Sequence, residues 1–147
     1  MKVTKDIEKM LKEDGFCVTG FHGVSMLPML REGEDRALIV PISGALKAGD
    51  VALFRRGEEY VMHRVAKKHG EFYIIRGDNC TERETVAAGD IVGVLKGFWR
   101  GADYYDCTGE YSAGFARRAR FTLPVRRAKA FLRKIIAKLT GREKTNG

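Results

Sequence analysis

The sequence has few of the residues that mark disulfide-bonded, metal-binding or membrane-spanning proteins. Its 147 residues include three cysteines, three prolines and one tryptophan. Cys17, Cys80 and Cys107 are odd in number and form no Cys-x-x-Cys pair, so we expect free buried thiols. No metal site and no cofactor are predicted. No run of about 18 consecutive apolar residues occurs, and a membrane-spanning helix is therefore not expected.

A secretory signal is also missing from the first residues. Residues 1–16, MKVTKDIEKMLKEDGF, are charged throughout, whereas a signal peptide places an apolar stretch after a short basic segment. Irregularly spaced free cysteines fit a reducing compartment. We expect a cytoplasmic protein, either free or attached peripherally to a membrane surface.

Acidic residues are nearly absent from the C-terminal quarter of the chain. Residues 1–112 carry 16 Lys and Arg against 18 Asp and Glu, a balance of −2, whereas residues 113–147 carry 11 against one, a balance of +10. A chain of this length builds one good core. We expect one folded domain over residues 1–111 and a basic appendage over residues 112–147, suited to phosphate-bearing surfaces or acidic proteins.

The central part of the sequence predicts a mainly β fold, because brief apolar runs alternate with glycine and charged turns. Five runs have the length and β-branching of strands: 36–40, 50–54, 60–65, 71–76 and 90–95. Residues 42–50 and 55–59 predict loops or turns, and the second would close a hairpin. Before them, Ile7, Met10 and Leu11 predict a short amphipathic helix over residues 4–13.

The basic appendage predicts helix over residues 112–139, interrupted at Pro124. In its second part the apolar residues follow helical spacing and basic residues fill the other positions, with the apolar set being Ala128, Phe131, Leu132, Ile135, Ile136 and Leu139. Two interpretations remain open. The apolar stripe packs on the folded domain, or the helix is a peripheral anchor on anionic lipid.

Three residues have the chemistry of nucleophilic catalysis. Ser25 lies in a Gly- and Pro-containing segment, where its hydroxyl is a candidate nucleophile. His63 lies on the predicted hairpin and can take a hydroxyl proton near neutral pH. Asp78 follows an apolar run, and we predict that its carboxylate orients or supports His63. Met26 and Pro28 are predicted to contact substrate, although Met26 can equally anchor the segment.

Four ordered blocks carry these residues: Ser25-Met26-Leu27-Pro28 with Gly33-Glu34, Gly49-Asp50-Val51, His63-Arg64-Val65, and Arg76-Gly77-Asp78-Asn79. Over residues 20–97 the chain resembles the type I signal peptidases and the related self-cleaving repressor peptidases. Most bacterial signal peptidases and the repressors carry lysine in the third block. The histidine found here is similar to the Ser-His branch of archaeal, endoplasmic-reticulum and sporulation-type enzymes.

The resemblance implies a β-sheet catalytic domain of the signal-peptidase type and a serine endopeptidase that cleaves a signal or leader peptide. It also implies a peptide or protein substrate bound as an extended strand. The chain departs from the branch at Glu84, which replaces a second aspartate, and at Gly23-Val24, which replaces Ser-Gly. We rank Asp78 above Glu84 as the third catalytic residue.

Other residues and other functions compete with this interpretation. His22 and His69 are rival bases, and Lys67 and Lys68 are expected in the same turn as His69. A repressor-like regulatory or nucleic-acid-binding module is disfavoured, because no helix-turn-helix can precede residue 16 and lysine is absent from the base position. A catalytically degenerate peptidase that acts as a scaffold is the third interpretation.

Overall fold

A computed structural model describes the backbone of residues 2–3, residues 6–108, and the helical residues 113–115, 117, 128–129 and 131–138. Its first elements are β1 (Lys2–Val3), α1 (Ile7–Glu13), β2 (Cys17–Thr19), β3 (Asp35–Val40) and β4 (Val51–Arg56). They are followed by β5 (Glu59–His69), β6 (Phe72–Arg76), β7 (Glu84–Ala87), the 3-10 turn η1 (Ala88–Asp90), β8 (Ile91–Arg100) and β9 (Asp103–Asp106).

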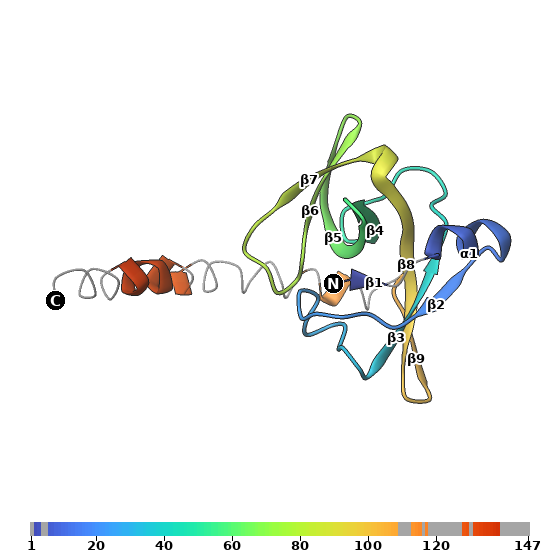
Figure 1. The fold of residues 1–147 in the computed structure, drawn as a ribbon, viewed down its shortest axis with the longest axis horizontal. Helices are drawn as coiled ribbons and strands as arrows, with labels where there is room; N and C mark the ends of the chain where they lie inside the picture. Colours follow the sequence, from blue (N-terminus) through green and yellow to red (C-terminus); the bar gives the residue numbers. More distant parts are fainter. Residues whose placement is uncertain are drawn as a thin grey trace.

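The strands form one antiparallel sheet that curls around its central strands (Figure 1). The order is β2-β3-β8-β4-β5-β6-β7, with β1 added beside β5 and β9 beside β8. The prediction of a mainly β fold is confirmed, and so are the five predicted strands and the short N-terminal helix. Strands β1, β2, β7 and β9 were not predicted individually.

The two faces of β4 pack into two separate hydrophobic clusters. Val51 and Leu53 join the cluster that contains the buried residues of α1, whereas Ala52 and Phe54 join the cluster that covers β6 and β7. Successive side chains of a strand point to opposite faces. A strand buried on both faces therefore has a continuous apolar run, and this explains why residues 51–54 lack alternation.

Strands β4 and β5 form the predicted hairpin, with Ala52 opposite His63. Gly57, at φ 61°, occupies the turn between them, in a conformation that glycine adopts without strain. Strand β5 continues to His69. The prediction that Lys67, Lys68 and His69 share a turn is therefore wrong: they pair with β6, because the sheet extends the strand beyond its apolar part.

The described C-terminal residues 128–129 and 131–138 are helical, and all are exposed. They lie to one side of the sheet (Figure 1, red). Pro124 and the predicted domain boundary between residues 111 and 112 lie outside the described residues. No helix in the described part of the chain has the length and apolar character needed to cross a membrane.

Candidate active site

Ser25 and His63 meet beside the middle of β5, an interior strand of the sheet. The Oγ atom of Ser25 lies 3.0 Å from Nε2 of His63, within hydrogen-bonding distance. Ser25 lies in the turn that follows β2, whereas His63 is held near the middle of β5 and is only 6% exposed. The predicted nucleophile and the predicted base, 38 residues apart in sequence, are therefore brought together.

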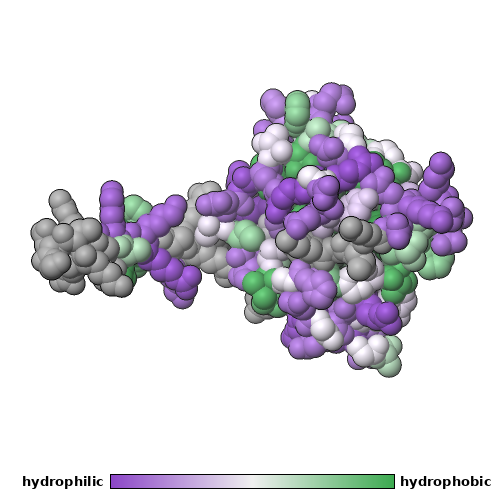
Figure 2. Space-filling model, in the orientation of Figure 1, coloured by the Kyte–Doolittle hydropathy of each residue, from purple (hydrophilic) through white to green (hydrophobic). Residues whose placement is uncertain are grey.

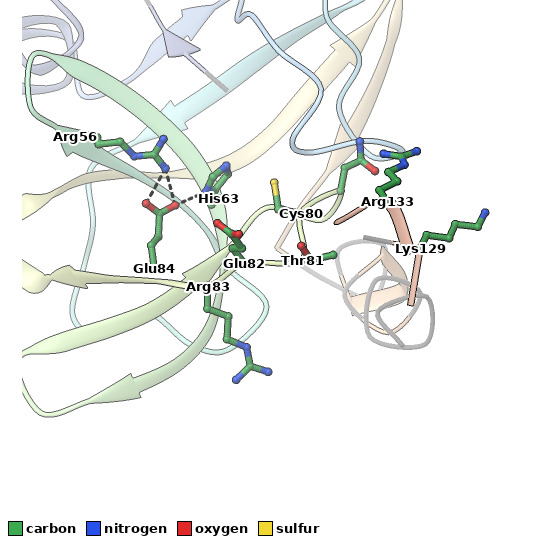
Figure 3. Close-up of a pocket in the computed structure, with 10 residues that line it drawn as sticks. Arg56, His63, Cys80, Thr81, Glu82, Arg83, Glu84, Lys129 and Arg133 are labelled. Atoms are coloured by element: carbon green, nitrogen blue, oxygen red, sulfur yellow. Dashed lines mark hydrogen bonds and ion pairs between the residues drawn. The ribbon is translucent and has the colours of Figure 1, made fainter. Parts of the chain in front are cut away.

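The other ring nitrogen of His63 contacts Glu84. Nδ1 lies 2.6 Å from Oε1 of Glu84, and Arg56 donates to both oxygens of the same carboxylate, each at 2.7 Å (Figure 3). With Ser25 donating to Nε2, the neutral ring donates its Nδ1–H to Glu84. The arrangement is a hydroxyl–imidazole–carboxylate relay, and Arg56 fixes the carboxylate.

Asp78 does not take the place predicted for it. Its two oxygens accept hydrogen bonds from Nε and Nη2 of Arg64, at 2.7 and 2.6 Å, in a pair buried from solvent. Arg64 follows His63 on β5, so the two side chains leave opposite faces of the strand. The carboxylate that pairs with Arg64 is on the wrong face for the imidazole. Ranking Asp78 above Glu84 as the partner of His63 was therefore wrong.

The Arg64–Asp78 pair joins the four sequence blocks instead. Arg64 also donates to the carbonyl oxygen of Gly49 at 2.8 Å and to the sulfur of Met29 at 3.1 Å. Gly49 belongs to the second block and Asp78 to the fourth, while Met29 directly follows Pro28 of the first block. One buried guanidinium thus ties the segment after Ser25 to the hairpin that carries His63.

The Gly77–Asn79 turn packs directly against the Val24–Ser25 backbone. Asn79 donates its backbone N–H to the Ser25 carbonyl at 2.7 Å and its side-chain amide to the Val24 carbonyl at 3.1 Å. A Cβ atom on Gly77 would lie 2.7 Å from the Ser25 carbonyl oxygen and 2.8 Å from Sγ of Cys80. Glycine is required at position 77 because no larger residue fits this approach.

Met26 and Pro28, the two predicted substrate contacts, differ in burial. Met26 is completely buried in the cluster that contains Ile7 and Leu11 of α1, so it anchors the nucleophile segment. A contact between Met26 and substrate is contradicted, because the core already surrounds its side chain. Pro28 is exposed, and its predicted contact with substrate stays a prediction.

The rival bases His22 and His69 are both exposed, and His22 contacts a carboxylate of its own. Nδ1 of His22 lies 2.9 Å from Glu32, whose other oxygen accepts the Gly23 N–H at 3.0 Å, and the His22 side chain is 80% exposed. His69 is exposed at the far end of β5. His63 is the histidine that these positions favour as the base.

Burial controls the protonation of His63. Desolvation lowers the pKa of the imidazole below its ordinary value of 6.5, and the hydrogen bond to Glu84 opposes this effect only in part. His63 is therefore neutral near pH 7. A neutral imidazole is the form that can accept the hydroxyl proton.

A cleft of about 830 Å³ opens beside His63. Its walls include the 79–84 segment, Arg56 on the sheet, and Lys129 and Arg133 on the C-terminal helix (Figure 3). The volume is in the range of sites that hold small molecules or short peptide segments. In the described residues, no group of three or more His, Cys, Asp and Glu side chains could hold a metal ion.

Cys17, Cys80 and Cys107 form no disulfide, and Cys17 and Cys107 are buried as expected. Cys80 differs from the prediction, because it is only partly buried and lines the cleft.

The sequence interpretation did not identify the roles of Arg56, Arg64 and Asn79. Arg64 and Asn79 belong to the four sequence blocks, and this was the one signal for them. Arg56 falls in the segment predicted as a turn, although the structure places it at the end of β4. A search found no protein-family model that matches the chain, and no curated protein matches it significantly.

Proposed function

We propose that this protein is a serine endopeptidase in which Ser25 is the nucleophile, His63 the general base and Glu84 the orienting carboxylate. The observation that carries the proposal is the continuous relay from the Ser25 hydroxyl through both ring nitrogens of His63 to Glu84. A serine hydroxyl is a weak nucleophile unless a neighbouring base removes its proton. The buried, neutral imidazole meets that requirement.

In the proposed reaction, Ser25 Oγ attacks a peptide carbonyl carbon while Nε2 of His63 takes its proton. His63 then donates this proton to the leaving amine, and the acyl-enzyme remains on Ser25. Water activated by the same imidazole hydrolyses the ester and restores the hydroxyl. Glu84 stabilises the imidazolium that forms in each step, and Arg56 keeps Glu84 in place.

We further propose a signal or leader peptide as the substrate, bound in an extended conformation, and a catalytic domain of the signal-peptidase type. The four ordered sequence blocks support this, because they meet around Ser25 and Arg64. Strand β7, which carries Glu84, is the last strand in the order of the sheet and therefore an edge strand. An edge strand next to a catalytic cleft can take an added peptide strand.

Covalent labelling with a fluorophosphonate probe tests the proposal without a known substrate. The wild-type protein should be labelled once, at Ser25, and Ser25→Ala and His63→Ala should each abolish labelling. Ser43→Ala and His69→Ala are matched controls, since both residues are exposed and His69 lies at the C-terminal end of β5, six residues beyond His63.

Labelling that persists in Ser25→Ala would contradict the assignment of the nucleophile. A folded wild-type protein that is never labelled would favour a degenerate scaffold. Circular dichroism of each variant separates loss of chemistry from loss of fold.

A further inference from the structure

The described part of the C-terminal helix exposes large apolar side chains. Phe131 is 66%, Leu132 56%, Ile135 39% and Ile136 57% exposed. Side chains packed on the folded domain would be buried. These exposed fractions therefore disfavour the interpretation in which the stripe packs on the domain. Figure 2 shows apolar and hydrophilic surfaces together on the helix.

The helix separates its apolar and basic side chains. At about 100° per residue, the four apolar residues fall within an arc of about 140°. Lys129 and Arg133 lie along one border of this arc, and Lys134 and Lys138 lie along the other. No acidic residue occurs between 113 and 142.

Cations on both borders of an apolar arc suit a helix that lies flat in a lipid interface. The apolar residues enter the boundary between headgroups and acyl chains, and the lysine and arginine stems extend so that their charges stay among the headgroups. Negative headgroups then attract each cation.

We propose that the helical residues 128–129 and 131–138 form an interfacial surface that binds the protein to membranes rich in anionic lipid. Charge and hydrophobicity together favour this partner over others. A nucleic acid would neutralise the cations but would leave the apolar arc in water. A second copy of the helix would cover the arc but would bring rows of like charge together.

Sedimentation of the full-length protein with lipid vesicles tests the proposal. The protein should bind vesicles of mixed phosphatidylcholine and phosphatidylglycerol and should not bind pure phosphatidylcholine. Raising the salt from about 0.1 M to about 0.5 M should weaken the binding, because the headgroup charges are screened.

Two double variants separate the contributions of the helix. Phe131→Ser with Ile135→Ser should reduce binding roughly tenfold or more by removing buried apolar surface. Lys134→Gln with Lys138→Gln should reduce it by a similar factor through lost attraction. Lys134 and Lys138 are chosen because they lie on the border that does not line the cleft.

Matched changes on the folded domain should leave vesicle binding unaltered. Phe16→Ser with Ile42→Ser removes two side chains of comparable exposure, and Lys9→Gln with Lys12→Gln removes two exposed charges from α1.

Three results would overturn the proposal. The first is vesicle binding that survives in both helix variants, and the second is a wild-type protein that does not bind anionic vesicles. The third is a concentration-dependent dimer or an RNA complex that the helix variants abolish and that anionic vesicles do not compete with. Fluorophosphonate labelling of Ser25 should be equal in all variants. A wild-type protein that is labelled normally but does not bind anionic vesicles rejects the interfacial helix alone, and a wild-type protein that binds vesicles but is never labelled rejects the proposed function alone.

Discussion

Glu84 lies 2.6 Å from Nδ1 of His63 and so occupies the position where a serine peptidase needs its third residue. Asp78, six residues earlier in the sequence, instead neutralises Arg64 on the opposite face of β5. The two carboxylates thus have different surroundings and, we expect, different functions. Their variants should behave differently in kinetics and in stability.

Replacing Glu84 should damage catalysis more than stability. Glu84→Gln removes the negative charge that stabilises the imidazolium, and the labelling rate of Ser25 should fall roughly hundredfold to ten-thousandfold. Glu84→Asp keeps the charge but shortens the arm, and it should retain more activity than the glutamine variant. Equal labelling rates for wild type and Glu84→Gln would exclude Glu84 from the relay.

Replacing Asp78 should damage stability first. Asp78→Asn leaves Arg64 buried without its ion pair, and the free energy of unfolding in urea should fall by about 3–5 kcal/mol. If this variant does not fold, Asp78→Leu with Arg64→Met should recover folded protein, because an apolar pair carries no desolvation cost. If Asp78→Asn were as stable as the wild type but lost labelling rate as predicted for Glu84→Gln, Asp78 and not Glu84 would be the carboxylate that supports His63.

The labelling rate should depend on pH through His63. The imidazole must be neutral to act as base, so the rate should rise with pH, and its midpoint should lie below 6.5 because burial lowers the pKa. Glu84→Gln should move this midpoint further toward acid, since the Glu84 contact raises the pKa. A midpoint at or above 6.5 in the wild type would contradict the buried position of His63.

The same shift has a consequence for stability. Since the pKa of His63 is lower in the folded state than in the unfolded state, the unfolded state binds more protons in acid. The contribution of His63 to stability is present above about pH 6.5 and is lost as the pH falls through the folded pKa. In urea titrations below pH 6.5, His63→Gln should lose less stability with falling pH than the wild type does.

Gly77→Ala should displace the nucleophile. The new methyl group would lie 2.7 Å from the Ser25 carbonyl oxygen, so the segment must shift. A displacement of about 1 Å can reduce a catalysed rate about hundredfold, and we expect a loss of that order in labelling. Gly20→Ala is the control, because a Cβ atom there meets no atom within 4 Å. Normal labelling of Gly77→Ala would show that the turn does not position Ser25.

Met26→Ala should act through the core. The side chain is completely buried in the core cluster that also contains Ile7 and Leu11, and its removal should lower the free energy of unfolding by about 2–5 kcal/mol. Val24→Ala, at a position 58% exposed, should cost far less. A folded Met26→Ala protein of unchanged stability that had lost labelling would instead support a direct contact with substrate.

The strands that could be predicted are those with enough buried residues to leave a pattern. Strands β3, β4, β5, β6 and β8 have five or more residues, and each buries at least two apolar side chains. Strands β2, β7 and β9 contain only three or four residues, which is too few to show a period. Their pairing with longer neighbours, and not their own composition, makes them strands.

The sequence by itself determined which chemical groups are available: a serine in a Gly- and Pro-containing turn, a histidine on a hairpin, two carboxylates six residues apart and a cationic amphipathic helix. Only the tertiary structure decided which carboxylate contacts the histidine. The reason is that neighbouring side chains on β5 point to opposite faces of the sheet. His63 therefore contacts Glu84 on one face, and Arg64 contacts Asp78 on the other. Order along the chain carries no information about the face on which a returning loop will lie.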